Sequence, residues 1–198
     1  MNPFTVHTGT AVPLRRDNID TDQIVPAEFC KRLTKSGYQD ALFAGWRTDP
    51  DFVLNQPTYA GASVLLSGRD FGIGSSREHA VWALNDGGFR AIVATGFGDI
   101  FRLNSVNNGL LLVDLPHAAV AELMDLVERA PSMPITCDLE SCRLRVADCI
   151  LQFPFDPKTR ERMLLGLDNI EATLLKRERI AAFESARDSW LPTVETRA

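Results

Sequence analysis

The sequence predicts an α/β domain in which short strands alternate with helices and the strands differ in direction. Two patterns support this fold class. Between residues 64 and 113, short apolar runs bounded by glycine alternate with segments whose apolar residues recur at helical spacing. After residue 135, three short alternating runs follow one another without intervening helices. No internal repeat or low-complexity linker divides the 198 residues, so we expect one domain.

The first half of the α/β pattern begins with a buried strand over residues 64–66. A glycine-rich loop over 69–74 leads into a helix from Ser76 to Leu84, which the Gly87-Gly88 pair ends. A second buried strand is expected over 91–94.

The pattern then repeats. Residues 96–108 place apolar side chains in helical order, residues 110–113 form another strand run, and Pro116 begins an amphipathic helix that ends before Pro131. The order from residue 64 is therefore β-α-β-α-β, followed by a helix.

The last third of the chain changes character. Residues 135–139, 142–146 and 149–153 predict a small antiparallel group. Past Pro157 the chain is helical, and Ile180, Phe183 and Trp190 are expected on one face of a charged helix that needs a surface to pack on. We divide the single domain, residues 1–198, into a core of about 1–165 and a helical C-terminal extension of about 166–198. The first 60 residues combine isolated aromatic residues with turn residues and predict long ordered loops near a site or an interface.

The composition excludes several classes of function. Lysine and arginine number 21 and aspartate and glutamate 26, giving a net charge of −5, so no overall basic field attracts nucleic acid or anionic lipid. No stretch approaches the roughly 18 apolar residues of a membrane span, and no targeting segment is evident. We expect a cytoplasmic protein that binds neither nucleic acid nor membrane, so any anion recognition must be local.

The four cysteines favour a reduced protein over a disulfide framework. Cys137, Cys142 and Cys149 have the spacing C-x4-C-x6-C, which raises the alternative of a metal or iron-sulfur site. They fall in predicted strands, however, where a cysteine is usually a small apolar core residue. We therefore expect no metal site and no cofactor site in this chain.

The most informative stretch is the glycine-rich segment 68–79, which runs directly into a helix. Ser75 followed by Glu78 is a capping-box pattern that predicts Ser75 as the N-cap. A helix start attracts anions, and Arg77 adds a planar donor fork suited to a carboxylate. The plainer alternative is a structural cap without catalytic meaning. A dinucleotide site is disfavoured because Arg77 stands where the third glycine of that motif belongs.

Four motifs also carry a family resemblance. These are the stretch from Asp17 to Pro26, the block from Gly72 to Ala80, the Gly109-Leu-Leu sequence, and the stretch from Gly166 to Leu174. In this order they resemble the small subunits of bacterial isopropylmalate isomerases, and the Ser-Ser-Arg-Glu-His block also resembles the mobile C-terminal domain of aconitase. The resemblance covers nearly the whole chain.

The resemblance implies a swivelling β/β/α domain that closes over a large subunit carrying a [4Fe-4S] cluster. The implied reaction removes water from 2-isopropylmalate and adds it back to give 3-isopropylmalate in leucine biosynthesis, and it requires both subunits. This chain departs from the family at two places. Ile73 replaces a frequent cysteine, so we assign no thiol chemistry there, and Val81 replaces a frequent proline.

The resemblance also implies roles for individual residues. Ser75 would act as the base, Arg77 as its charge partner and carboxylate clamp, and Ser76 as a further substrate contact. Asp22 would orient Arg77, although a turn residue is an equally good interpretation. Lys31 and Arg32 lie where the family places its substrate-recognition loop, and the alternative is a solvated basic loop.

Two rival functions stay open at this stage. The same fold serves related hydro-lyases, so the chain could be the small subunit of a citraconate or homoaconitate hydratase. It could also be a non-catalytic assembly module, although the joint presence of Ser75, Arg77 and Asp22 argues against that.

Overall fold

The computed structural model describes residues 1–74, 77–188 and 190–191, and over these residues the chain forms two sheets and a layer of helices. The strands are β1 (Val6–Gly9), β2 (Ala11–Leu14), β3 (Val64–Phe71), β4 (Ala91–Phe97), β5 (Leu111–Asp114), β6 (Ile135–Asp138), β7 (Arg143–Val146) and β8 (Cys149–Gln152). The α-helices are α1 (Thr21–Ile24), α2 (Glu78–Asp86), α3 (Asp99–Asn107), α4 (His117–Arg129), α5 (Pro157–Leu165), α6 (Asn169–Leu174) and α7 (Arg177–Ser185). Short 3-10 helices are η1 (Ala27–Lys31), η2 (Trp46–Thr48), η3 (Val53–Asn55) and η4 (Pro57–Tyr59).

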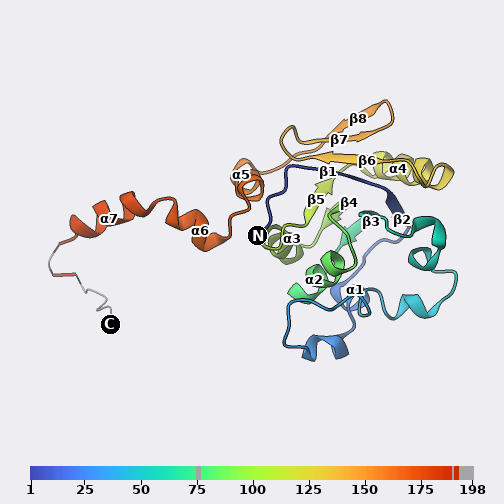
Figure 1. Cartoon of the computed structure of the whole chain (residues 1–198), viewed down its shortest axis with the longest axis horizontal. Coiled ribbons are helices and arrows are strands. Elements are labelled where there is room, and N and C mark those ends of the chain that lie inside the picture. Colours follow the sequence, from blue (N-terminus) through green and yellow to red (C-terminus); the bar gives the residue numbers. More distant parts are fainter. Residues whose placement is uncertain (75–76, 189, 192–198) are drawn as a thin grey trace.

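The two sheets have different topologies. Strands β2, β3, β4 and β5 pair in parallel in that order, and the crossover helices α2 and α3 connect β3 to β4 and β4 to β5. Strands β1, β6, β7 and β8 form an antiparallel sheet in that order. Figure 1 shows the parallel sheet between the antiparallel sheet and the helices α1, α2 and α3. The predicted β/β/α arrangement is thereby confirmed.

The parallel sheet separates two hydrophobic cores. On β3, Val64 and Leu66 face the antiparallel sheet and α4, whereas Leu65 between them faces the core that contains α2. Strand β4 alternates in the same way, with Val93 on the first side and Ile92 on the second. Because successive side chains of a strand point to opposite faces, each strand supplies both cores at once.

The first 60 residues contain two strands and a helix that the sequence pattern did not predict. Strand β2 carries Pro13, which lacks a backbone N–H and therefore suits an edge strand. Strand β1 also lies at an edge, and its side chains alternate between exposed and half-buried. Each of them has only four residues, so β1 shows too short an alternation, and β2 too short an apolar run broken by Pro13, for the sequence pattern to mark them.

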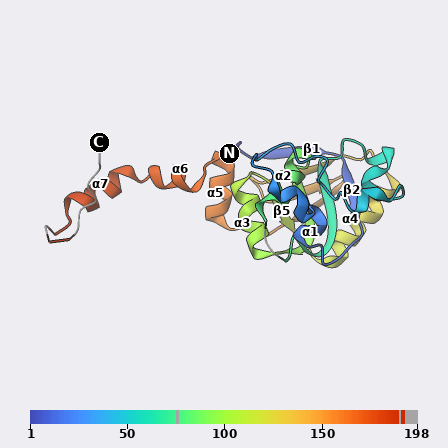
Figure 2. The same cartoon turned by 90° about the horizontal axis from the view of Figure 1, so that it is seen from below.

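The C-terminal part departs from the predicted helix in one respect. Helix α7 ends at Ser185, so Trp190 lies outside it and does not continue the face formed by Ile180 and Phe183. Figures 1 and 2 show α6 and α7 extending away from both sheets. Among the described residues, none of the helices combines the length and apolar composition needed to cross a bilayer.

Candidate active site

The site residues stand on two segments that backbone hydrogen bonds join. The chain after β2, residues 17–24, lies along the chain after β3, residues 71–74. The N–H of Gly72 donates to the carbonyl of Ile19 at 2.7 Å, and the N–H of Thr21 donates to the carbonyl of Ile73 at 3.0 Å. Both segments follow the carboxyl ends of parallel strands, which is where ligand sites of open α/β sheets occur.

Helix α1 holds Asp22 at this edge. Asp20 is the N-cap of the helix, and its carboxylate accepts a hydrogen bond from the N–H of Gln23 at 2.7 Å. The side chain of Gln23 accepts in return from the N–H of Asp20 at 2.9 Å, which completes a capping box. A helix of only four residues is not stable alone, so this cap and the bonds to Ile73 fix the position of Asp22.

Close backbone approach explains one pair of glycines in the same region. Gly72 has a φ of 73°, and a Cβ there would collide with the ring of Phe101. A Cβ on Gly98 would lie 2.5 Å from the carbonyl oxygen of Gly72. The turn after β3 therefore packs directly on the turn after β4, and only glycine allows this contact.

Arg77 and Asp22 meet at the start of α2. Arg77 has an extended backbone and is the N-cap residue of the helix, and its guanidinium donates to the carboxylate of Asp22. This hydrogen bond is the main cause that raises the pKa of Arg77 above its ordinary value. A guanidinium has five N–H donors in a planar fork, so Arg77 can hold Asp22 and a substrate carboxylate at the same time.

The predicted capping box at this helix is wrong. The N-cap of α2 is Arg77 rather than Ser75, and no side chain caps the helix among the described residues. Glu78 instead accepts a hydrogen bond from the side-chain amide of Asn108 at 2.9 Å. The partner of Glu78 thus comes from the end of α3, thirty residues further along the chain, where a local sequence pattern cannot detect it.

Ser75 and Ser76, the predicted base and substrate contact, lie outside the described residues. Of the described residues on either side, Gly74 follows β3 and Arg77 is the N-cap of α2. The roles of both serines remain predictions.

The predicted substrate-recognition loop lies beside Arg77. The thiol of Cys30 in η1 is among the groups that raise the pKa of Arg77, after the contribution of Asp22. Lys31 is the last residue of η1 and is exposed. The family resemblance placed this loop near the site, but no local pattern singled out Cys30, because its contact depends on how the loop folds back.

Arg32 has a well-defined place within this loop. Its guanidinium forms two hydrogen bonds of 2.7 Å each with the carboxylate of Asp40, and it lies 4.9 Å from the centre of the Phe29 ring. The structure therefore gives Arg32 a part in closing the loop. A contact between Arg32 and a substrate stays a prediction.

Aromatic side chains fix the loop against α2. Tyr38 is fully buried, and its N–H donates to the carboxylate of Asp86 at 2.8 Å. The ring of His79 lies 5.7 Å from that of Tyr38 and 4.7 Å from that of Trp82. Burial, followed by the charge of Arg77, lowers the pKa of His79 below 6.5. His79 is therefore a packing residue next to the site, held mainly in its neutral form.

The cysteines do not form a ligand set for an iron-sulfur cluster. Cys137 is fully buried between the sheets, and burial raises the pKa of its thiol to about 12, which disfavours the thiolate that ligates iron. Cys149 is exposed at the start of β8. Within the described part of the chain, no group of three or more His, Cys, Asp or Glu side chains could hold a metal ion.

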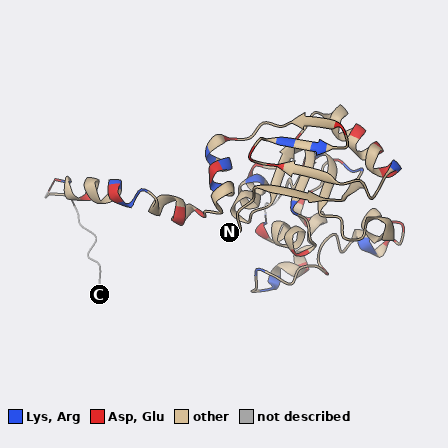
Figure 3. Ribbon diagram, turned by 45° about the horizontal axis from the view of Figure 1, so that its top comes forward, with Lys and Arg blue, Asp and Glu red and all other residues tan. Residues whose placement is uncertain are grey.

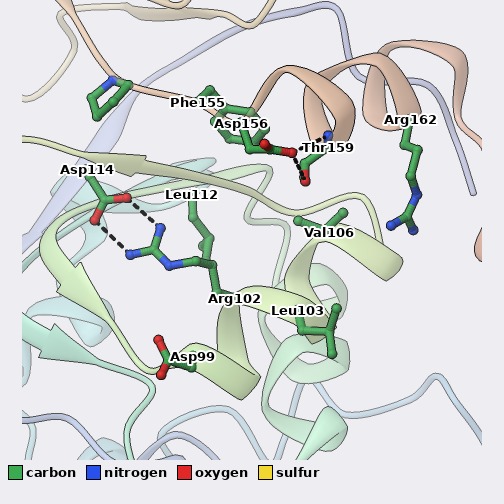
Figure 4. Close-up of a pocket in the computed structure, with 11 residues that line it drawn as sticks. Asp99, Arg102, Leu103, Val106, Leu112, Asp114, Phe155, Asp156, Thr159 and Arg162 are labelled. Atoms are coloured by element: carbon green, nitrogen blue, oxygen red, sulfur yellow. Dashed lines mark hydrogen bonds and ion pairs between the residues drawn. The ribbon is translucent and has the colours of Figure 1, made fainter.

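A pocket of about 390 Å³ lies elsewhere on the same sheet edge, between α3, the end of β5 and α5. Arg102 and Asp114 form a bidentate ion pair in its wall, and Phe155, Thr159 and Arg162 face it from the other side (Figure 4). Neither Asp22 nor Arg77 lines it. The pocket and the Asp22–Arg77 pair are therefore separate features of this sheet edge.

Comparison with known protein families defines the class first. The model of the aconitase C-terminal domain matches residues 1–118, which include both sheet-edge segments of the site. The described fold and this match agree on an aconitase-type β/β/α domain.

More specific relatives match over nearly the full length. The chain is 54% identical over 193 residues to the 3-isopropylmalate dehydratase small subunit of Acidothermus cellulolyticus, which covers 98% of each chain. It is 51% identical to that of Thermobifida fusca, covering 98% of this chain and 100% of the relative. It is 53% identical to that of Streptomyces coelicolor, covering 97% of this chain and 98% of the relative. The chain therefore belongs to the 3-isopropylmalate dehydratase small-subunit family.

A solved structure supports the fold. The crystal structure of a 3-isopropylmalate dehydratase from Methanocaldococcus jannaschii superposes with a TM-score of 0.63 at 23% sequence identity. The match covers 90% of this chain and 99% of the archaeal chain.

Proposed function

We propose that this chain is the small subunit of a 3-isopropylmalate dehydratase, which interconverts 2-isopropylmalate and 3-isopropylmalate by removing and re-adding water. The observation that carries the proposal is the full-length similarity to relatives of that name. The pairing of Asp22 with Arg77 at the start of α2 supports it, because a dicarboxylate substrate needs a positioned donor fork.

Arg77 is assigned to the substrate carboxylate. Dehydration requires loss of a proton next to a carboxylate, and the charge that grows on that carboxylate must be stabilised. The planar guanidinium and the N–H groups at the first turn of α2 both favour negative charge at this point. Asp22 is assigned to positioning, since its carboxylate holds one side of the guanidinium.

Ser75 is assigned as the base and Ser76 as a further substrate contact, both on the family resemblance. The physical support is indirect. A serine hydroxyl is a weak acid, and the neighbouring Arg77 and the start of α2 stabilise its anionic form. Lys31 is assigned to substrate binding because it is exposed in the loop that lies beside Arg77. Arg32 is assigned to the same loop, with its pairing to Asp40 holding the loop closed.

The cofactor is assigned to the partner. Aconitase-type enzymes are iron-sulfur enzymes, and the cysteines described above do not fit a cluster. We therefore place the [4Fe-4S] cluster on the large subunit, and this chain supplies the positioned acid-base and carboxylate-binding groups. The isolated chain should be colourless and inactive, and the substrate should bind where the two subunits meet.

Ser75 provides the test of the catalytic assignment. The chain is co-expressed with its large subunit under anaerobic conditions, and turnover of isopropylmalate is compared for wild type, Ser75→Ala and Ser75→Asp. Removal of a general base should lower kcat by about 10²- to 10⁴-fold. Because Arg77 is the N-cap of α2, the free energy of unfolding should change by only about 0.5 kcal/mol or less.

Ser141→Ala, in the turn between β6 and β7 of the other sheet, is the matched control and should retain full turnover. Ser75→Asp should be folded and nearly inactive, because its carboxylate would occupy the anion site beside Arg77. Near wild-type turnover by Ser75→Asp would place the base elsewhere. Preference for citraconate or homoaconitate over isopropylmalate in the same assay would reassign the substrate.

A further inference from the structure

The C-terminal arm, defined as residues 167–188, exposes apolar side chains along its length. Ile170, Leu175 and Phe183 are each 70% exposed. Figures 1 and 2 show α6 and α7 projecting from the end of α5, away from both sheets. Scattered single apolar residues on a surface need no explanation, whereas a succession of them on one projecting element marks an interaction surface.

The arm is too short to be stable on its own contacts. Helix α6 has six residues and α7 has nine, and isolated helices shorter than about 12 residues are marginal in water. Their visible support is local, with a capping box formed by Asp168 and Glu171 at α6 and a bond from the Ser185 hydroxyl to the carbonyl of Ala181 in α7. Helices of this length acquire stability when an apolar face is covered.

The root of the arm is firmly attached to the domain. The N-terminal ammonium group of Met1 donates to the carbonyl of Gly166 at 2.9 Å, and the N–H of Phe4 donates to the carbonyl of Met163 at 2.9 Å. Gly166 adopts a left-handed conformation that ends α5, and α6 begins three residues later. The arm therefore leaves the domain from a fixed point.

One face of α7 has a defined chemistry. Lys176, Arg179, Ile180 and Phe183 line a shallow hollow along the helix, and their spacing of three and four residues places them on a single face. Glu178 falls on the opposite face by the same geometry. Both signs of charge occur along the arm (Figure 3), and the charged residues of this face are Lys176 and Arg179. Because apolar and basic side chains share this face, it would fit an apolar groove with an acidic rim on another protein.

This chemistry disfavours a second copy as the occupant. A symmetric pairing of two α7 helices would bring together two copies of a face whose only charged residues are Lys176 and Arg179. Like charges at an interface act against association. A different protein with acidic groups beside an apolar groove meets the face without that repulsion.

The small-subunit relatives share the arm as well as the domain. The aconitase C-terminal domain model ends its match at residue 118, whereas the small-subunit relatives match over 192 to 195 residues. At least most of the arm therefore belongs to the part that proteins named as separate subunits share. A domain that is a separate subunit has no peptide link to its partner, so its surface must supply the attachment.

We propose that the arm is a docking element for the large subunit, with the Lys176, Arg179, Ile180 and Phe183 face of α7 bound in an apolar groove that has an acidic rim. This inference rests on the proposed function for the existence of that partner. An anchored arm raises the local concentration of the domain at its partner, while the sheet edge with Arg77 stays available for the substrate.

The test uses the full chain with the double substitution Ile180→Ser and Phe183→Ser, and Glu178→Gln as the matched control on the opposite face. All three positions are on the exposed arm, so thermal unfolding of the core should be unchanged. Affinity for the purified large subunit is measured by titration calorimetry, and turnover is measured over a range of large-subunit concentrations. We expect the double variant to bind at least about tenfold more weakly. Its turnover at saturating large subunit should equal wild type, and the control should bind normally.

Unchanged affinity of the double variant would overturn the proposal. It would also be overturned if sedimentation showed that the wild-type chain self-associates and the double variant does not, with equal affinity for the large subunit, because a second copy would then be the occupant. These outcomes are distinct from failure of the proposed function, in which the wild-type complex forms and does not turn over isopropylmalate.

Discussion

Two arginine-aspartate pairs lie at the carboxyl edge of the parallel sheet, and they differ in how the chain brings them together. Asp22 and Arg77 are 55 residues apart and meet because two turns are joined by backbone hydrogen bonds. Arg102 and Asp114 are 12 residues apart and meet across the single connection between α3 and β5. The second pair lines the pocket shown in Figure 4 and the first does not, although the side chains of both pairs are partly exposed.

The two pairs also differ in the contacts of their guanidinium groups. The Arg102 pair is bidentate, with N–O distances of 2.5 and 3.0 Å, and its guanidinium lies 5.2 Å from the centre of the Phe97 ring. Its contacts are therefore occupied by its own neighbours. The Arg77 pair stands at the start of a helix beside a loop that can contact a ligand, and a closing partner would complete it.

The largest effect is expected at Arg77. Arg77→Ala should lower the kcat/KM of the reconstituted enzyme by about 10²- to 10³-fold, because a donor aimed at the developing charge is lost. Asp22→Asn should have a smaller effect, about tenfold to 100-fold, because it misorients Arg77 without removing it. Steady-state kinetics on isopropylmalate, with affinity for the large subunit as control, measures both. An equal loss of kcat/KM in Arg77→Ala and Asp22→Asn would show that Asp22 does more than position Arg77.

A smaller effect, confined to stability, is expected at the second pair. Arg102→Ala should leave turnover unchanged and lower the free energy of unfolding by about 0.2 to 1 kcal/mol, as for other partly exposed ion pairs. Urea unfolding combined with the same kinetic assay checks this. Loss of activity in Arg102→Ala at full large-subunit saturation would show that the pocket, and not only the Asp22–Arg77 pair, serves the reaction.

The smallest effect is a dependence of stability on pH that involves His79. The folded chain lowers the pKa of His79 from 6.5, so the unfolded chain binds the proton more readily. Stability should therefore fall as the pH drops below about 6.5, through the interval down to the lowered pKa. Urea unfolding of wild type and His79→Gln is measured between pH 8 and pH 5. The free energy of unfolding should depend less steeply on pH in the variant than in wild type. Since the charge of Arg77 contributes to the lowered pKa, Arg77→Ala should also reduce the slope, and identical slopes in all three proteins would disprove this origin.

The periodic elements of the fold could be predicted from the sequence. Strands β3 and β4 begin as expected at Val64 and Ala91, because buried parallel strands are short continuous apolar runs. The three antiparallel strands after residue 135 and the amphipathic α4 were also predicted, and the structure confirms them. In each case the local sequence pattern and the tertiary environment agree.

Features that depend on distant contacts could not be predicted in this way. The alternative partner of Glu78, the amide of Asn108, overrides the local capping pattern. The contact between Asp22 and Arg77 depends on the bridge between Asp20 and Ile73, which no periodicity indicates. The family resemblance pointed to this pair where local physics did not. The capping box of α1, an aspartate followed three residues later by a glutamine, was not recognised because four residues are too few to show a helical period.

The division between a core and a C-terminal extension near residue 165 remains a prediction. Helix α5 ends at Leu165, and the arm begins beyond Gly166. Proteases cleave folded proteins first where the chain is exposed and makes few contacts with the rest of the domain. The arm should therefore be the first segment to be cleaved in limited proteolysis.

The presence of two cores limits where residues can be inserted into or deleted from such a protein. Each strand of the parallel sheet sends alternate side chains to opposite cores, so the sheet is a wall shared by two compartments. Insertion of one codon within β4 would exchange Ile92 and Val93 between the compartments and disrupt both at once. In-frame insertions and deletions should therefore accumulate in the connections, above all in residues 26–63 between α1 and β3, while the strands of the wall vary only by substitution.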